Sequence, residues 1–199
     1  MQYALKLLAA SPFEIGLAVP NAQARKNTHQ VVDLGRYPSA PAIPPSGDVA
    51  GWYFSSKGFI REPDGTMTNF AVQDGCGDVI PWAINDSGVF VGWAFNGSGC
   101  STLVGFLRAK DGTITTVSGL EGWHNTQLRS VDAKGTAVGV YEDAGGIQRA
   151  FVRSPEGILT QFAPLANVLT IDITSSGNGT IAGSYYDPDS DQYLGFLQN

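Results

Sequence analysis

The sequence predicts an all-β protein: a four-bladed β-propeller of four-stranded antiparallel blades, with the last blade shared between the N- and C-termini. Three observations support this fold class. The 199 residues include 25 Gly and 11 Pro, which favours short strands and many turns over long helices. A unit of about 45 residues recurs along the chain, a period typical of propellers and solenoids. The two ends of the chain each carry part of a unit.

Each unit begins with a strand centred on glycine. The equivalent glycines are separated by 41, 47 and 44 residues, and they are Gly51, Gly92, Gly139 and Gly183. Apolar or aromatic residues flank each of them, as in Val91-Gly92-Trp93. A glycine repeated inside a strand predicts close approach of the neighbouring strand.

The second strand of each unit carries an aromatic residue, which we expect to pack between neighbouring blades: Phe59, Phe106, Phe151 and Phe196. An acidic residue followed by Gly comes next, as at Asp111-Gly112, and predicts a tight hairpin because Gly accepts a positive φ. A Thr-rich third strand follows. An apolar pair and a turn, as in residues 83–88, then close the unit as its fourth strand.

The two chain ends predict how the ring closes. The fourth unit reaches Asn199 after its second strand, whereas residues 30–35 resemble a third strand and residues 40–47 match 83–88. Two strands from each end would complete a fourth blade and remove the free sheet edges. An open arc that dimerises into a larger ring, and a stacked β-solenoid, fit the same repeat.

Residues 1–27 are predicted to be a leader, and residues 28–199 a single β-repeat domain. Residues 1–24 hold two apolar patches and end in Ala22-Gln23-Ala24, which has the form of a signal-peptidase site. Pro12 and Glu14 interrupt the apolar region, so an export signal and a flexible leader both stay open. No apolar run of about 18 residues occurs, and we therefore expect no membrane-spanning helix.

The composition excludes some classes of protein, and the two cysteines bear on the compartment in which the protein is expected. The 12 Lys and Arg against 18 Asp and Glu give a net charge of -6, which argues against nucleic-acid binding. The 43% of hydrophobic residues argues against disorder. Cys76 and Cys100 lie in Gly-rich loops and are predicted to form a disulfide between adjacent blades, as an exported protein permits. The alternative is two unpaired thiols.

An acidic loop in the fourth unit is a candidate calcium site. Its three carboxylates, Asp187, Asp189 and Asp191, occupy alternate positions, and calcium favours clustered oxygen ligands. The loop lacks the Gly and the distal Glu of an EF-hand. A solvated acidic hairpin tip is the competing interpretation, and we expect no other cofactor.

Aromatic residues in two loops are the candidate ligand-binding residues. Trp123 and His124 lie in one loop, and Tyr185 and Tyr186 open another. A Trp ring can stack on a sugar or another planar ligand, although it can equally pack across its own loop. The sequence has 2 His and no Gly-x-Ser-x-Gly elbow, so no catalytic residue is predicted.

Several motifs resemble the bacterial extracellular repeats called HAF repeats. They are Asp111-Gly112-Thr113-Ile114-Thr115-Thr116, the Ala-Ile-Asn-x-x-Gly of residues 83–88, and Val-x-Gly followed by Trp or Tyr. The resemblance covers about residues 28–199 and implies a secreted or surface-associated β-repeat protein with no catalytic motif to transfer. The sequence departs from the pattern at Pro44-Pro45 and at Val131-Asp132, where the turns are expected to differ locally.

The sequence as a whole predicts a monomeric extracellular module that recognises a surface, a glycan or a protein without catalysis. We expect it to be secreted, periplasmic or attached to the cell surface. A carbohydrate-active hydrolase or lyase is the alternative, using paired carboxylates among Glu142, Asp143, Asp187 and Asp189. A purely structural repeat without a ligand is a third reading.

Overall fold

The structure is a computed structural model, and it describes residues 38–42, 47–53, 57–72, 75–118, 120–162, 169–176 and 178–199. The regular structure in these ranges consists of β-strands, which confirms the all-β prediction. Within them there is no helix with the length and hydropathy that crossing a membrane requires. The predicted leader at 1–27 and the strand expected at 30–35 lie outside the described residues.

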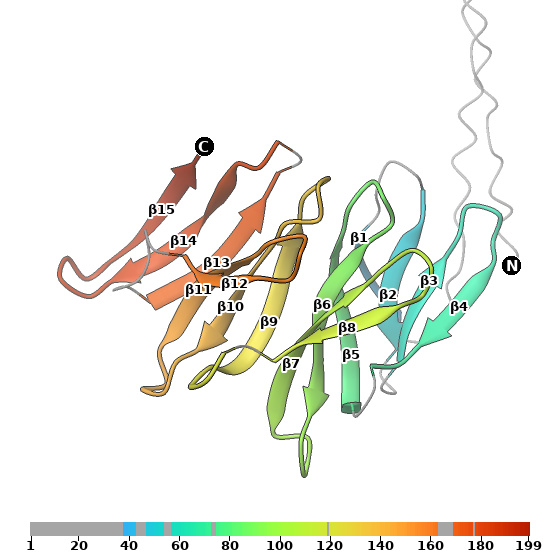
Figure 1. The fold of residues 1–199 in the computed structure, drawn as a ribbon, viewed down its shortest axis with the longest axis horizontal. Helices are drawn as coiled ribbons and strands as arrows, with labels where there is room; N and C mark the ends of the chain where they lie inside the picture. The colour runs from blue at the N-terminus through green and yellow to red at the C-terminus, as the bar shows by residue number, and fades with distance from the viewer. Residues whose placement is uncertain are drawn as a thin grey trace, which may run out of the picture. The chain divides into compact units, whose positions relative to one another are not determined.

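The strands form antiparallel sheets that follow one another along the chain (Figure 1). The first sheet contains β1 (Pro38–Ala42), β2 (Val49–Tyr53), β3 (Lys57–Arg61) and β4 (Met67–Phe70). The second contains β5 (Gly75–Ile84), β6 (Phe90–Asn96), β7 (Thr102–Arg108) and β8 (Ile114–Val117). The third contains β9 (His124–Val131), β10 (Ala137–Glu142), β11 (Gln148–Arg153) and β12 (Leu159–Gln161). The fourth contains β13 (Leu169–Ser175), β14 (Ile181–Asp187) and β15 (Gln192–Gln198) among the described residues.

Each sheet begins one strand earlier than the sequence unit predicts. The strand that closes the first unit is β5, and it pairs with β6, so it opens the second sheet. The reason is the turn at Asn85, whose N–H donates to the Val89 carbonyl, because so tight a turn makes the flanking strands hydrogen-bonded neighbours. The prediction that residues 40–47 help to complete the last blade is therefore wrong: β1 pairs with β2.

The repeated glycines lie where a bulged first strand meets the second strand. In the second sheet the register shifts between Pro81 and Ala83, and Pro81 lies opposite Gly92. A Cβ at Gly92 would overlap the carbonyl oxygen of Ile80, and Gly139 and Gly183 meet the carbonyls of Gln127 and Asp172 in the same way. The predicted close strand approach is thus confirmed, and glycine is required because any side chain would collide with backbone.

Three hydrophobic clusters hold successive sheets together. The first joins Ala50 and Ile60 of the first sheet to Phe106 of the second. The second joins Val91 to Phe151, and the third joins Val140 to Ile173. Each cluster therefore lies between one sheet and the next.

The repeated aromatic position behaves as predicted in three of the units. Phe59, Phe106 and Phe151 are fully buried. Phe196 is half-buried and packs against the third cluster from the fourth sheet. Inter-sheet packing is therefore confirmed for Phe106, Phe151 and Phe196, with the last ring partly exposed, while Phe59 is buried beside Tyr53 of its own sheet.

Asn85 links the second sheet to the third through its side chain. Its Oδ1 accepts hydrogen bonds from the N–H groups of Ser87 and Val89, both at 3.0 Å. Its Nδ2 donates to the Asp132 carbonyl at 2.8 Å, in a site where Asn85 is 6% exposed. The Asn of the repeated motif thus closes its own turn and reaches the neighbouring sheet at once.

Asp132 stands where the next unit departs from that motif. Its Oδ1 accepts from the N–H groups of Lys134 and Thr136, at 2.9 and 2.8 Å, so the turn keeps its geometry. A carboxylate has no N–H to donate onward, and the Ser130 hydroxyl donates to the Ser175 carbonyl at 3.1 Å instead. The departure changes the bond between sheets rather than the turn.

Candidate functional site

The two ends of the sheets differ in their connections. One end carries the short turns that join β5 to β6, β7 to β8 and β9 to β10. The opposite end, called here the loop end, carries the β6–β7, β10–β11 and β14–β15 turns and the connections from each sheet to the next. Binding residues are common on irregular loops held by a rigid scaffold, so a binding site is expected at the loop end.

A pocket of about 300 Å³ opens at the loop end between the second and third sheets. This volume is at the lower limit of small-molecule sites. Its lining combines two aromatic rings, one aliphatic side chain, three amides, a hydroxyl and a carboxylate: Phe95, Ser101, Leu103, Asn125, Gln127, Tyr141, Glu142 and Gln148. We call it the amide pocket.

Asn125 holds the two walls of the amide pocket together. Its Oδ1 accepts from the Leu103 N–H at 3.0 Å, and its Nδ2 donates to Oε2 of Glu142 at 2.7 Å. The backbone of Asn125 has a φ of 48°, a left-handed conformation that Asn tolerates better than most residues. Asn125 therefore fixes the orientation of the Glu142 carboxylate.

The other amides of the pocket are also oriented by hydrogen bonds. Oε1 of Gln127 accepts from the Arg129 guanidinium at 2.9 Å. Nε2 of Gln148 donates to the Thr170 carbonyl at 2.7 Å. Burial raises the pKa of the Tyr141 phenol, so this group stays a neutral hydroxyl at neutral pH. The pocket thus presents polar groups in fixed directions.

Trp123 lies against the same region but faces the core. Its ring stacks on Tyr141 with centroids 3.6 Å apart and an angle of 7°, and it lies 5.4 Å from Phe151. Trp123 therefore packs on residues of β10 and β11, and ligand binding by Trp123 and His124 stays a prediction. His124 is exposed as the first residue of β9. His124 belongs to the third sheet, and Trp123 directly precedes it.

Tyr185 and Tyr186 belong to the fourth sheet, so the structure does not bring the four predicted aromatic and histidine residues onto one sheet. Tyr185 is half-buried against the third cluster. The Tyr186 hydroxyl donates to Oδ1 of Asp191 at 2.8 Å, which raises the pKa of Tyr186. Both tyrosines thus have structural contacts within the β14–β15 hairpin or its core.

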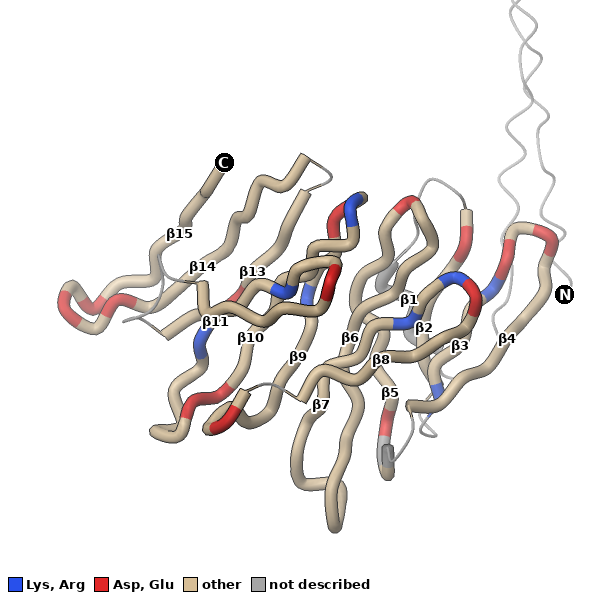
Figure 2. The backbone as a smooth tube through the Cα atoms, in the orientation of Figure 1, with Lys and Arg blue, Asp and Glu red and all other residues tan. Residues whose placement is uncertain are grey.

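Of the three predicted calcium ligands, Asp187 ends β14 and the other two lie in the β14–β15 turn, where Figure 2 shows a concentration of acidic residues. Asp187 accepts from the Ser190 hydroxyl at 2.7 Å and from the Asp189 N–H at 3.1 Å, and these bonds lower its pKa. Within the described ranges, no group of three or more acidic, His or Cys side chains is arranged to hold a metal ion. Calcium binding at Asp187, Asp189 and Asp191 stays a prediction that calorimetry tests.

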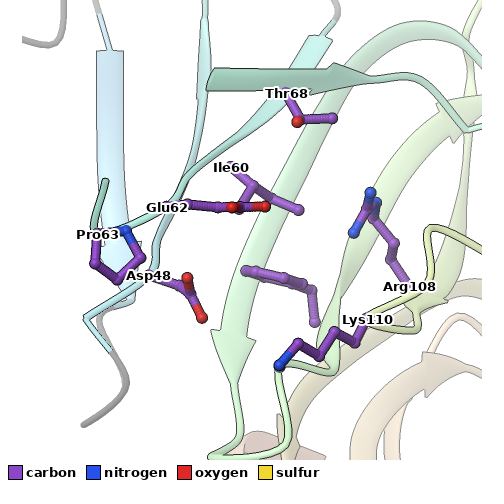
Figure 3. Close-up of a pocket in the computed structure, with 9 residues that line it drawn as sticks. Asp48, Ile60, Glu62, Pro63, Thr68, Arg108 and Lys110 are labelled. Atoms are coloured by element: carbon purple, nitrogen blue, oxygen red, sulfur yellow. The ribbon is translucent and has the colours of Figure 1, made fainter. Parts of the chain in front are cut away.

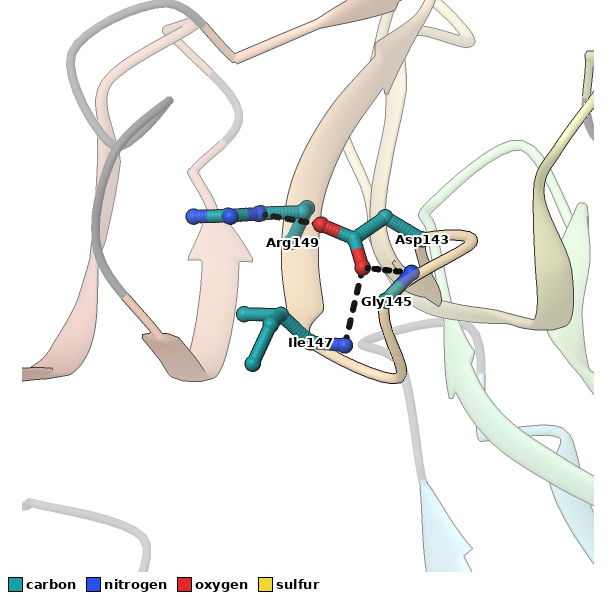
Figure 4. Close-up of polar contacts among 4 residues, drawn as sticks. All are labelled: Asp143, Gly145, Ile147 and Arg149. Carbon is teal, nitrogen blue, oxygen red and sulfur yellow. Dashed lines mark hydrogen bonds and ion pairs between the residues drawn. The ribbon is translucent and has the colours of Figure 1, made fainter.

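Asp143 closes the β10–β11 turn (Figure 4). Its Oδ1 accepts from the N–H groups of Gly145 and Ile147, and its Oδ2 pairs with Nε of Arg149, each at 2.9 Å. The Ile147 N–H and then the Arg149 side chain lower the pKa of Asp143. A carboxylate held in this way is a poor proton donor at neutral pH.

Cys76 and Cys100 form a disulfide, as predicted, with Cα atoms 5.5 Å apart. The prediction that it joins adjacent blades is wrong. Cys76 lies in β5 and Cys100 in the β6–β7 turn, so both belong to the second sheet. The error follows from the one-strand shift, because β5 opens the second sheet instead of closing the first.

No protein-family model matches the sequence, and no curated protein matches it either. Three solved structures show distant similarity. A catalytically inactive virginiamycin B lyase from Staphylococcus aureus with quinupristin has a TM-score of 0.48 and 12% identity, covering 84% of this chain and 57% of its own. The selenomethionine-substituted enzyme from the same organism has a TM-score of 0.37 and 11% identity, and the match covers 80% of this chain and 69% of that structure. A streptogramin B lyase has a TM-score of 0.37 and 11% identity, and the match covers 80% of this chain and 68% of that structure. The chain thus spans little more than half the length of the first of these structures.

Proposed function

We propose that the protein is a non-catalytic recognition module that binds a neutral glycan in the amide pocket. The observation that carries this proposal is the lining of the pocket. Amide groups from Asn125, Gln127 and Gln148, together with the Glu142 carboxylate, suit the alternating donors and acceptors of sugar hydroxyls. Phe95 adds aromatic surface, against which the apolar face of a sugar ring packs, whereas the Tyr141 ring is buried and stacked on Trp123.

The carboxylates at the loop end favour binding over hydrolysis. A glycoside hydrolase needs two carboxyl groups flanking the bond, one of them protonated at the working pH. Asp143 and Asp187 have lowered pKa values and act as hydrogen-bond acceptors in their turns. Among the described residues, Glu142 is the one carboxylate that lines the amide pocket, so no second acid of a hydrolase or lyase pair is seen there in that part of the chain.

The setting we propose for this activity is a secreted, periplasmic or surface-attached monomer. The disulfide is compatible with an oxidising compartment. The repeat pattern and the succession of antiparallel sheets support a four-bladed propeller related to HAF repeats.

A glycan array followed by calorimetry on the best glycan tests the proposal. Gln127→Ala and Glu142→Gln are expected to weaken binding about tenfold each, since each removes or neutralises one oriented group. The matched control is Gln161→Ala, which changes an exposed amide on β12 and should leave affinity unchanged. Affinity unchanged in both pocket variants would refute the assignment.

An assay for released reducing sugar on the same glycan separates binding from catalysis. We expect no release by the wild-type protein. Turnover that Glu142→Gln abolishes would instead establish the hydrolase or lyase alternative, because that change keeps the shape of the side chain and removes its acid and base chemistry.

A further inference from the structure

A second pocket lies at the end of the sheets opposite the amide pocket, between the first and second sheets. Its volume is about 340 Å³. Asp48 and Glu62 line one side of it, and Arg108 and Lys110 line the other (Figure 3). Ile60 and Phe90 contribute apolar surface. We call it the charged pocket, and none of the residues that line the amide pocket takes part in it.

Arg108 is a buried cation with little compensation from the protein. It is 9% exposed, and its Nε has no hydrogen-bond partner. Its NH1 donates to the Ala109 carbonyl at 3.3 Å, and the guanidinium lies 5.3 Å from the centre of the Phe70 ring. Within the described residues no carboxylate lies within 4.0 Å of it to form an ion pair. Asp111 interacts with Arg108 electrostatically but not as an ion pair in contact, so an anionic group bound in the pocket would supply the direct pairing that buried charges normally have.

The other units show what is particular to this Arg. Arg61 and Arg153 occupy the equivalent position and donate to the next carbonyl at 3.2 and 3.1 Å. Both are half-buried, whereas Arg108 is buried. The Arg-to-carbonyl bond is therefore a feature of the repeated turn, and the burial of an underpaired guanidinium beside a pocket distinguishes the second sheet.

Three charges in the charged pocket replace uncharged residues of the other units. Asp48 stands where the later units have Val89, Thr136 and Thr180, and Glu62 stands where they have Ala109 and Ser154. Lys110 stands where the first and third units have Pro63 and Pro155. The repeated turn thus does not require these charges. All three departures converge on one cavity.

The distribution of charge selects the ligand class. A simple anion would satisfy Arg108 and Lys110 but would meet the two carboxylates opposite them. A simple cation would satisfy the two carboxylates but would be repelled by Arg108 and Lys110. A molecule with a carboxylate at one side and an ammonium at the other complements both walls. The cavity volume suits a molecule of this small size.

We propose that the charged pocket binds a small zwitterion of the α-amino-acid class, with its carboxylate on Arg108 and Lys110 and its ammonium on Asp48 and Glu62. The apolar surface of Ile60 and Phe90 favours an apolar side chain on the ligand. This site is separate from the proposed glycan site and extends the function of the protein beyond it.

Calorimetry with three related probes tests the proposal on the full chain. L-leucine carries both charges, N-acetyl-L-leucine only the negative one and L-leucinamide only the positive one. We expect L-leucine to bind at concentrations up to about 10 mM and each singly charged probe to bind roughly tenfold more weakly. No heat with L-leucine would overturn the proposal, and equal affinity for N-acetyl-L-leucine would overturn the assignment of a zwitterion.

Variants drawn from the other units locate the binding without disturbing the turns. A triple variant with Asp48→Thr, Glu62→Ala and Lys110→Pro installs residues that the same turns already contain. It is expected to unfold cooperatively, as the wild type does, and to lose L-leucine binding by at least about tenfold. Asp189→Ala, a charge removed from the β14–β15 turn, is the control that keeps binding. L-leucine binding that survives in the triple variant would refute the site, and unchanged glycan binding in that variant would show that the amide pocket is intact.

Discussion

Replacing Asn85 by Asp separates the two roles of this side chain. The carboxylate of Asn85→Asp can still accept the two backbone N–H bonds of the turn, as Asp132 does in the next unit. It cannot donate to the Asp132 carbonyl, which loses a 2.8 Å hydrogen bond in a buried site. Leaving a buried acceptor without its donor costs about 1–3 kcal/mol. For a chain of this size, each kcal/mol lowers the melting temperature by roughly 2–4 °C.

The cost in Asn85→Asp should depend on pH. The two backbone N–H donors of the turn lower the pKa of the new carboxyl, whereas burial and the nearby Asp132 carbonyl oxygen raise it; we expect the second pair of effects to be larger and the pKa to lie above the usual value of about 3.9. A group whose pKa is higher in the folded state stabilises the fold below its unfolded pKa and loses that contribution as pH rises through the folded pKa. The variant should therefore approach wild-type stability near pH 4, where a protonated carboxyl donates to the carbonyl, and be least stable at neutral pH.

Urea unfolding followed by Trp fluorescence at several pH values measures this effect. The matched control is Asp132→Asn, which keeps the acceptor for its own turn and should change the free energy of unfolding by less than about 1 kcal/mol. Asn85→Ala, which loses all three hydrogen bonds, should be less stable than wild type at every pH. An Asn85→Asp variant as stable as wild type at pH 7 would refute the inter-sheet role of the amide.

Three further changes test other parts of the fold. Gly183→Ala should lose about 1–3 kcal/mol or fail to fold, because its Cβ collides with backbone, whereas Gly195→Ala on the adjacent strand, with its nearest neighbour at 3.7 Å, should retain wild-type stability in the same urea assay. Cys76→Ser should lose about 3 kcal/mol by opening a 24-residue separation, and mass spectrometry of the wild-type protein should show alkylation only after reduction. Arg149→Gln should raise the pKa of Asp143 but leave it below about 3.9, because the backbone donors of the turn remain; a carboxyl NMR titration measures this, and an unchanged pKa would contradict the role of the ion pair. The lowered pKa also means that Asp143 stabilises the turn above pH 3.9, and that this contribution is lost as pH falls through the folded value.

The repeated motifs predicted the strands well but misplaced the boundaries of the sheets. The residues 83–88 were correctly expected to be a strand end and a turn, and Gly92 correctly marked a close strand approach. The period of a repeat does not show where one unit ends and the next begins, so a unit boundary can be placed after any of its strands. The boundary between two sheets is set by which strands are hydrogen-bonded to each other. The tight turn at Asn85 pairs β5 with β6, so β5 belongs to the second sheet.

The amide pocket could not be predicted from the sequence, and the reason differs from that for the sheet boundaries. Its lining residues come from β6, β7, β9, β10, β11 and the β6–β7 turn, and most are ordinary polar strand residues such as Gln127 and Gln148. Only the packing of the second sheet against the third brings them together. Trp123 stood out as an unusual loop residue, yet its contact with Tyr141 makes it part of the support beneath the pocket. The replacement of Pro by Lys110 was visible in the repeat and is the signal that leads to the charged pocket.

The three separate hydrophobic clusters have a consequence for local opening of the protein. The second and third sheets each belong to two clusters, whereas the fourth sheet contributes to one of the clusters described. When each element contacts only its neighbours, stability is close to a sum of nearest-neighbour terms. Amide hydrogen exchange should therefore be slowest in β6 and β10 and faster in β14, so that the β14–β15 hairpin opens in excursions that leave both pockets intact.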